Sequence, residues 1–127
     1  MLSDYCIYTI KHSDDLHKTE NTGRAGTYVE RRRWASANRL LEKAQQEGRR
    51  LPIVFAPAEK TNPLFGWALL DKIIVEGGET RYSFSELRPF PEVRHKSSLK
   101  KRNGERLSQN FIRPYAICRT PAYLREV

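Results

Sequence analysis

The chain has 127 residues and a formal net charge of +8, with 39% hydrophobic residues and two cysteines. This length suits one domain with its own core, and two cysteines are too few for a disulfide scaffold. The first residues include acidic ones where a signal peptide is basic, and no apolar run approaches the roughly 20 residues of a membrane span. We therefore expect one cytoplasmic domain over residues 1–127, with no cofactor, no metal and no membrane contact.

The positive charge is concentrated in two segments. Residues 24–50 carry eight basic and three acidic residues, and residues 88–119 carry nine basic and two acidic ones. The residues between these segments are mildly acidic. Segregation of this kind is typical of a surface that neutralises the phosphates of a polyanion, although solubility alone also explains part of it. The charge pattern therefore favours nucleic acid as the partner.

The N-terminal part of the chain predicts a strand and a loop. Residues 4–10 are aromatic and β-branched, which indicates the first strand. Residues 11–26 are polar, contain glycine and lack hydrophobic periodicity, which predicts a long exposed loop with a binding role or local disorder. Two histidines lie there near two aspartates, but their spacing matches no metal-ligand pattern.

Residues 27–47 have the strongest helical pattern. Thr27 and Glu30 have the spacing of a capping box, and Gly48 suits the first position after a helix. Apolar residues recur every three or four positions from residue 37 to residue 44. One long helix after the first strand is therefore predicted.

The first turns of this predicted helix carry three consecutive arginines, Arg31, Arg32 and Arg33. Consecutive positions point in different directions around a helix, so at least one arginine faces solvent near the N-terminus, where phosphate is favoured. Trp34 follows them, and core packing and base stacking are equal alternatives for its ring.

Residues 64–90 form the clearest supersecondary signal, a long β-hairpin. Gly77 and Gly78 suit a tight turn between two strands rich in apolar and β-branched residues. Both faces of the first arm are apolar around Trp67, as expected in a closed barrel or a helix-covered sheet. Residues 51–56 predict the preceding strand, and Lys60 lies in the turn that connects it to the hairpin.

The C-terminal part predicts a basic ribbon, a last strand and a short helix. Residues 95–110 are basic and polar, with a tight turn at Asn103 and Gly104. Residues 111–119 predict the final strand. Thr120 followed by proline indicates a short C-terminal helical turn.

The order of these elements resembles the PUA-like superfamily of small domains, which includes the PUA, ASCH, EVE and YTH domains. Phrases that carry the resemblance are residues 29–32, the strand pair of residues 65–70 and 82–84, and the break at residues 87–89. Glu30 and Arg32 match the Glu and Arg of the ASCH pattern Gly-x-Lys-x-x-Glu-x-Arg, whereas Ala25 and Thr27 replace its Gly and Lys.

The resemblance implies a fold and a function. The implied fold is α+β: a small, mainly antiparallel β-barrel with one long helix after the first strand and a short C-terminal helix. The implied function is binding of RNA or DNA, in several members with a modified base in an aromatic-lined pocket. Residues that could line such a pocket are Trp34, Phe55, Trp67 and Tyr82.

Three functions remain open. The leading hypothesis is a non-catalytic reader of RNA or of modified-base DNA or RNA. Its expected contacts are Arg31, Arg32, Arg33, Trp34, Lys60, Trp67, Arg88, Lys100, Lys101, Arg102, Arg106 and Arg113. The second is a small ribonuclease or base-modifying hydrolase that uses Glu30 with Arg32, or His95 with Lys96. The third is an accessory subunit that binds a protein partner in a larger nucleic-acid-processing system.

Overall fold

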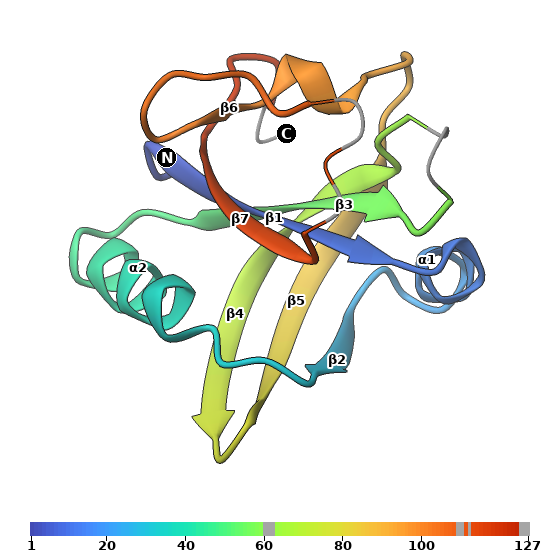
Figure 1. Cartoon of the computed structure of the whole chain (residues 1–127). Helices are drawn as coiled ribbons and strands as arrows, with labels where there is room; N and C mark the ends of the chain where they lie inside the picture. The colour runs from blue at the N-terminus through green and yellow to red at the C-terminus, as the bar shows by residue number, and fades with distance from the viewer. Residues whose placement is uncertain (60–62, 109–110, 112, 125–127) are drawn as a thin grey trace.

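The computed structural model describes residues 1–59, 63–108, 111 and 113–124 (Figure 1). Its elements in chain order are β1 (Tyr5–Lys11), α1 (Ser13–Asn21), β2 (Gly26–Glu30), α2 (Ala35–Gln46), β3 (Leu51–Pro57), β4 (Gly66–Glu76), β5 (Glu79–Pro89), the 3₁₀ turn η1 (Lys96–Ser98), β6 (Lys100–Lys101) and β7 (Tyr115–Arg119). Within these residues the strands form one sheet of order β2-β5-β4-β3-β1-β7-β6. Pairing is antiparallel except between β1 and β3.

The sheet is strongly curled but does not close into a barrel, so the predicted closed barrel is wrong. The edge strands β2 and β6 share no ladder in the described part of the chain. Side chains nevertheless connect strands that are far apart in the sheet order: the Lys11 ammonium of β1 lies 4.5 Å from the centre of the Tyr28 ring of β2. Tyr28 also contacts Phe55 of β3, with ring centroids 6.1 Å apart. Since β6 has only two residues, it offers too few backbone groups to complete a ladder with β2.

The central hairpin is confirmed. β4 and β5 turn at Gly77 and Gly78, and the positive φ of Gly77 (57°) explains the glycine there. Both faces of the start of β4 are buried, because the sheet packs on both sides. One core cluster contains Ala68 and Leu70, and the other contains Trp67 and Leu69.

The predicted helix over residues 27–47 is wrong in its first third. Residues 26–30 form the edge strand β2, and the helix begins at Ala35. The buried hydroxyl of Thr80 on β5 donates to the Arg32 carbonyl (2.6 Å) and accepts from the Trp34 backbone N–H (2.9 Å). These bonds hold the connection against β5, so it cannot continue as a helix. The predicted end of this helix is confirmed, since Gly48 follows α2 with a φ of 68°.

Two further predictions at the surface are wrong. The loop predicted over residues 11–26 contains α1, which buries Leu16 and Thr19 at helical spacing and has two aspartates in its first turn. With only one large apolar residue in this helix, the sequence showed no periodicity. Over the described residues the short C-terminal helix implied by the resemblance is not formed, whereas the single turn predicted after Thr120 is present and is closed by a bond from the Leu124 N–H to the Pro121 carbonyl.

Of the remaining strands, β1 and β3 were predicted at nearly the observed bounds and β7 was predicted four residues too long at its start. β1, β3 and β7 occupy the segments expected from residues 4–10, 51–56 and 111–119, although β7 begins only at Tyr115. The tight turn predicted at Asn103 and Gly104 is confirmed, since β6 turns back through Gly104, whose φ is 90°. The predicted exposed ribbon is only partly observed, because Lys96 is buried in η1 and residues 109–110 lie outside the described residues.

Candidate nucleic-acid interface

The aromatic residues expected to line a base pocket pack against one another instead. The Trp34 ring is fully buried between Tyr82 and Tyr115, at centroid distances of 4.6 and 4.9 Å and interplanar angles of 16° and 13°. Both ring faces are therefore covered, and no base can stack on them. Phe55 and Tyr82 are also buried in this cluster.

Trp67 lies in the other core cluster, away from the Trp34 stack. Trp67 is 5% exposed, and the Arg88 guanidinium lies 4.7 Å from the centre of its ring. Arg88 is in turn 3.1 Å from the Glu86 carboxylate. Trp67 and Arg88 thus stabilise the β4–β5 hairpin, and neither is a free contact for nucleic acid.

Most of the other cations predicted to contact nucleic acid lie in two separate regions of the surface, one after β2 and one on the β6 hairpin. Arg31 and Arg32 are exposed just after β2, whereas Arg33 donates to the Gly77 carbonyl at the hairpin turn. Four cations lie on the β6 hairpin: Lys100, Lys101, Arg102 and Arg106. Lys101 pairs with Glu105 (3.8 Å), and Arg102 lies over the Tyr5 ring. Lys60 lies outside the described residues.

Arg31 and Arg32 line a cavity of about 320 Å³, which we call the β1–β2 cavity. Its walls come from the ends of three strands, and its lining is Ile10, Lys11, His12, Val29, Glu30, Arg31, Arg32 and Ala58. The volume lies at the lower end of the range for ligand pockets, about 300–1,000 Å³. The curl of the sheet creates this cavity, because it brings the end of β1 beside edge strand β2.

Glu30 is the one acidic group in the lining of this cavity, among three basic side chains and His12. Partial burial raises the pKa of its carboxyl, while the charges of Lys11 and Arg32 act to lower it. The sequence assigned Glu30 to a capping box, but no helix begins at Thr27, so the carboxyl has no capping role. It is instead a half-buried acid in a basic cavity, an environment common for functional carboxyls.

Lys11 and Glu30 connect the β1–β2 cavity to the aromatic cluster. The Tyr82 hydroxyl is buried, and its pKa is well above the ordinary value because of burial first and of the charges of Glu30 and Tyr28. The Tyr28 hydroxyl shares a hydrogen bond with the Thr19 hydroxyl (2.7 Å), which connects β2 to α1. Tyr28 is thus held between α1 and Lys11, which lines the cavity.

The sequence did not identify Lys11 and His12 as site residues. Both fell in the predicted loop, whereas Lys11 ends β1 and His12 precedes α1. Arg113 was predicted and is exposed. Its neighbour Pro114 accepts a hydrogen bond from the Thr9 hydroxyl (2.8 Å), which places Arg113 beside the end of β1. Lys11 is the last residue of β1, so its position at a strand end was the sequence signal that could have identified it as a site residue.

His95 and Lys96 do not form the catalytic pair considered above. Lys96 is 3% exposed and its ammonium donates to the Phe111 carbonyl (3.2 Å), so it fixes the chain before β7. Burial lowers its pKa. His95 is exposed, and its carbonyl accepts from the Ser98 hydroxyl (2.7 Å).

Comparison with known proteins does not assign the chain. No family model matches it, and a search of curated proteins found no match. Over the residues that the structure covers, no helix is both long and apolar enough to cross a membrane. The same residues contain no group of three or more His, Cys, Asp or Glu side chains placed to hold a metal ion.

Proposed function

We propose that this protein binds nucleic acid, with the β1–β2 cavity as the contact for one nucleotide. The observation that supports this most is the lining itself, in which Lys11, Arg31 and Arg32 share one cavity with the half-buried carboxyl of Glu30. Cations in the lining suit phosphates, and a half-buried carboxylate suits the amino group of a base. The resemblance to the PUA-like superfamily points to the same class of ligand and, like a cytoplasmic location, remains a proposal.

The side chains in this proposal have separate tasks. Arg31 and Arg32 are exposed, so they neutralise phosphates and set the salt dependence of binding. Glu30 accepts a hydrogen bond from an exocyclic amino group and gives the site its base preference. Lys11 is held over the Tyr28 ring and balances the charge of Glu30. No stacking by Trp34 or Trp67 is required.

The test is fluorescence anisotropy with single- and double-stranded RNA and DNA at several salt concentrations. The double variant Arg31→Ala with Arg32→Ala should weaken binding and reduce the slope of log K against log salt by about 0.7 per lost phosphate contact on a single strand. Lys72→Ala is the matched control, because Lys72 is an exposed cation on β4 outside the lining of the cavity. Equal affinity and slope for the double variant and the wild type would contradict the proposal.

Acid–base chemistry at Glu30 is a second candidate function. The raised pKa of the Glu30 carboxyl and the neighbouring Arg32 would suit a general acid or base beside a charge stabiliser in RNA cleavage. Incubation of end-labelled RNA with the wild type and with Glu30→Gln tests this candidate. Cleavage by the wild type alone would support a ribonuclease, whereas intact RNA in both samples would reject one.

A further inference from the structure

Three cations form a row at the edge of the sheet where β7, β6 and the segment after the Gly104 turn lie side by side. Lys100 of β6 is directly opposite Arg119 of β7, and on its other side it forms a bridge with Arg106. Residues that are opposite in a ladder share a face of the sheet, and neighbouring strands are about 4.8 Å apart. The row of Arg119, Lys100 and Arg106, here called the cationic row, thus spans about 10 Å.

This arrangement is unfavourable without a counterion. Like charges directly opposite one another destabilise a sheet. All three side chains are exposed, and none of them forms an ion pair with a residue that the structure describes. The next residue of the same strand differs, since Lys101 pairs with Glu105. Lys101 is therefore neutralised by an acidic partner, whereas the three residues of the cationic row have no such partner in the described part of the chain.

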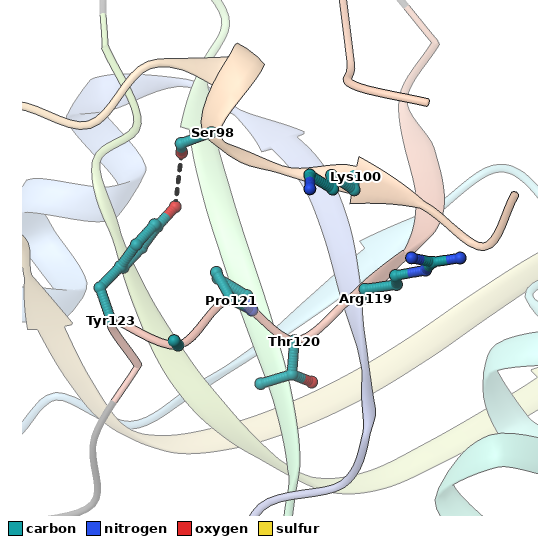
Figure 2. A pocket seen from close by; sticks show the side chains of 7 residues that line it. Ser98, Lys100, Arg119, Thr120, Pro121 and Tyr123 are labelled. Atoms are coloured by element: carbon teal, nitrogen blue, oxygen red, sulfur yellow. Dashed lines mark hydrogen bonds between the residues drawn. The ribbon is translucent and has the colours of Figure 1, made fainter. Parts of the chain in front are cut away.

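A cleft of about 610 Å³ adjoins two members of the row. Its lining is Ser98, Lys100, Arg119, Thr120, Pro121, Ala122 and Tyr123, with no acidic side chain among them (Figure 2). The hydroxyls of Ser98 and Tyr123 share a hydrogen bond of 2.6 Å across the cleft. The Arg94 guanidinium lies 4.3 Å from the centre of the Tyr123 ring and is paired with the Glu92 carboxylate (3.4 Å).

The cleft is held in shape by contacts outside its lining. The Arg119 guanidinium donates to the Arg102 carbonyl (3.0 Å) and packs beside Gly104, where a Cβ would lie 3.4 Å from it. The Thr120 hydroxyl donates to the Ser3 carbonyl (2.7 Å), and the Tyr123 ring packs edge-on against Phe90. The positions of Arg119 and Tyr123 are thus set before any ligand binds, which lowers the entropy lost on binding.

We propose that the cationic row and this cleft bind the terminal phosphate of a nucleic-acid strand. A phosphate monoester carries about −1.5 to −2 charges at pH 7 and three strong acceptor oxygens, which suits three neighbouring exposed cations without an acidic partner among the described residues. A row about 10 Å wide serves one phosphate group and not a long series of diesters. This inference rests on the proposed function, because the phosphate belongs to the end of the same nucleic-acid strand whose base is proposed to bind in the β1–β2 cavity.

The experiment compares short single strands that are identical except for a 5′-phosphate, a 3′-phosphate or two hydroxyl ends. We expect one phosphorylated end to bind about tenfold more tightly than the hydroxyl ends, as two charge-assisted hydrogen bonds would allow. Lys100→Ala and Arg106→Ala should each reduce this advantage. Lys101→Ala is the matched control, since it removes the same charge from the same hairpin at a position paired with Glu105.

Each outcome separates this inference from the proposed function. Equal binding of all strands, with binding still weakened by the Arg31→Ala and Arg32→Ala variant, would overturn the end-phosphate site and leave the β1–β2 cavity in place. Inorganic phosphate serves as the competitor. If it binds the cleft as tightly as a phosphorylated strand, the site is one for free phosphate and the assignment to a strand end is wrong. Loss of the advantage in Lys101→Ala as in Lys100→Ala would also contradict it.

Discussion

The indole of Trp34 lies parallel to the ring of Tyr82 at 4.6 Å, and this contact joins the start of α2 to the middle of β5. Tyr115 of β7 covers the opposite face of the indole. One side chain thus connects a helix with two strands that have no ladder between them. In a curled sheet without closure, such side-chain contacts take the place of the missing ladder.

Replacement of Trp34 should therefore affect stability and not recognition. Trp34→Ala should lower the free energy of unfolding by about 3–5 kcal/mol, the usual cost of removing a buried tryptophan. Trp34→Phe should cost less, because it keeps a ring in the stack. Urea denaturation measures both changes. Nucleic-acid affinity per folded molecule should match the wild type, and a large loss of affinity in folded Trp34→Phe would restore a base-stacking role.

The two cysteines should be inert to thiol reagents in the native protein. Cys6 and Cys118 are directly opposite one another on β1 and β7, and both are buried. Burial raises the pKa of the Cys118 thiol to about 12 and that of Cys6 further still. We expect no reaction with a chromogenic disulfide at pH 8 until denaturant is added. Rapid native labelling of either cysteine would contradict the packing of β7 on β1.

The same thiols predict a loss of stability in alkali. Their folded pKa values lie above the unfolded value of about 8.5, so the unfolded chain releases protons first as the pH rises. Stability from the neutral thiols is therefore complete below about pH 8.5 and declines as the pH rises towards the folded values. Cys118→Ala should show a smaller decline in melting temperature between pH 8 and pH 10 than the wild type.

Much of the sheet could be predicted from local sequence, whereas the break between β2 and α2 could not. The β4–β5 hairpin depends on Gly77, Gly78 and adjacent apolar runs, all of which are local. The break depends on Thr80, which bonds to Arg32 and Trp34 from about fifty residues away. A capping-box pattern at Thr27 could not compete with that contact, since tertiary interactions override local propensity.

The candidate site shows the same limit. The sequence placed Arg31, Arg32 and Arg33 at the start of a helix with at least one of them exposed; that helix begins only at Ala35, but Arg31 and Arg32 do line the cavity. Lys11 joins them only because the curl of the sheet brings the end of β1 to β2, a long-range consequence of strand order. Composition also could not show that Arg88 forms an ion pair with Glu86 and packs over the Trp67 ring.

Gly66 should tolerate no side chain. A Cβ at this position would overlap the Arg88 carbonyl and lie 2.8 Å from the Cα of Pro89. Since backbone atoms cannot move aside as a side chain can, Gly66→Ala must separate β4 from β5 locally. We expect a loss of about 1–3 kcal/mol or more in the free energy of unfolding. Gly78→Ala is the control, because a Cβ there meets nothing within 4 Å.

Glu30 should make both stability and binding depend on pH. Its folded pKa is raised by burial above the unfolded value of about 4.3, so the native state holds the proton to higher pH than the unfolded chain. The stability that Glu30 contributes is therefore complete below about pH 4.3 and is lost as the pH rises through the folded pKa. Glu30→Gln, which mimics the neutral form, should raise the melting temperature slightly at pH 7 and leave it unchanged near pH 4.

The effect of the same change on binding depends on the role of the carboxylate. If Glu30 accepts a hydrogen bond from a base amino group, Glu30→Gln should weaken binding of strands that carry this base and alter binding of other strands little. If Glu30 only repels phosphates, the variant should instead tighten binding of every strand equally, because one negative charge has been removed. Anisotropy with homopolymers of each base at pH 7 separates these results. Uniform tightening would remove Glu30 from base recognition and leave the arginines as the main contacts of the cavity.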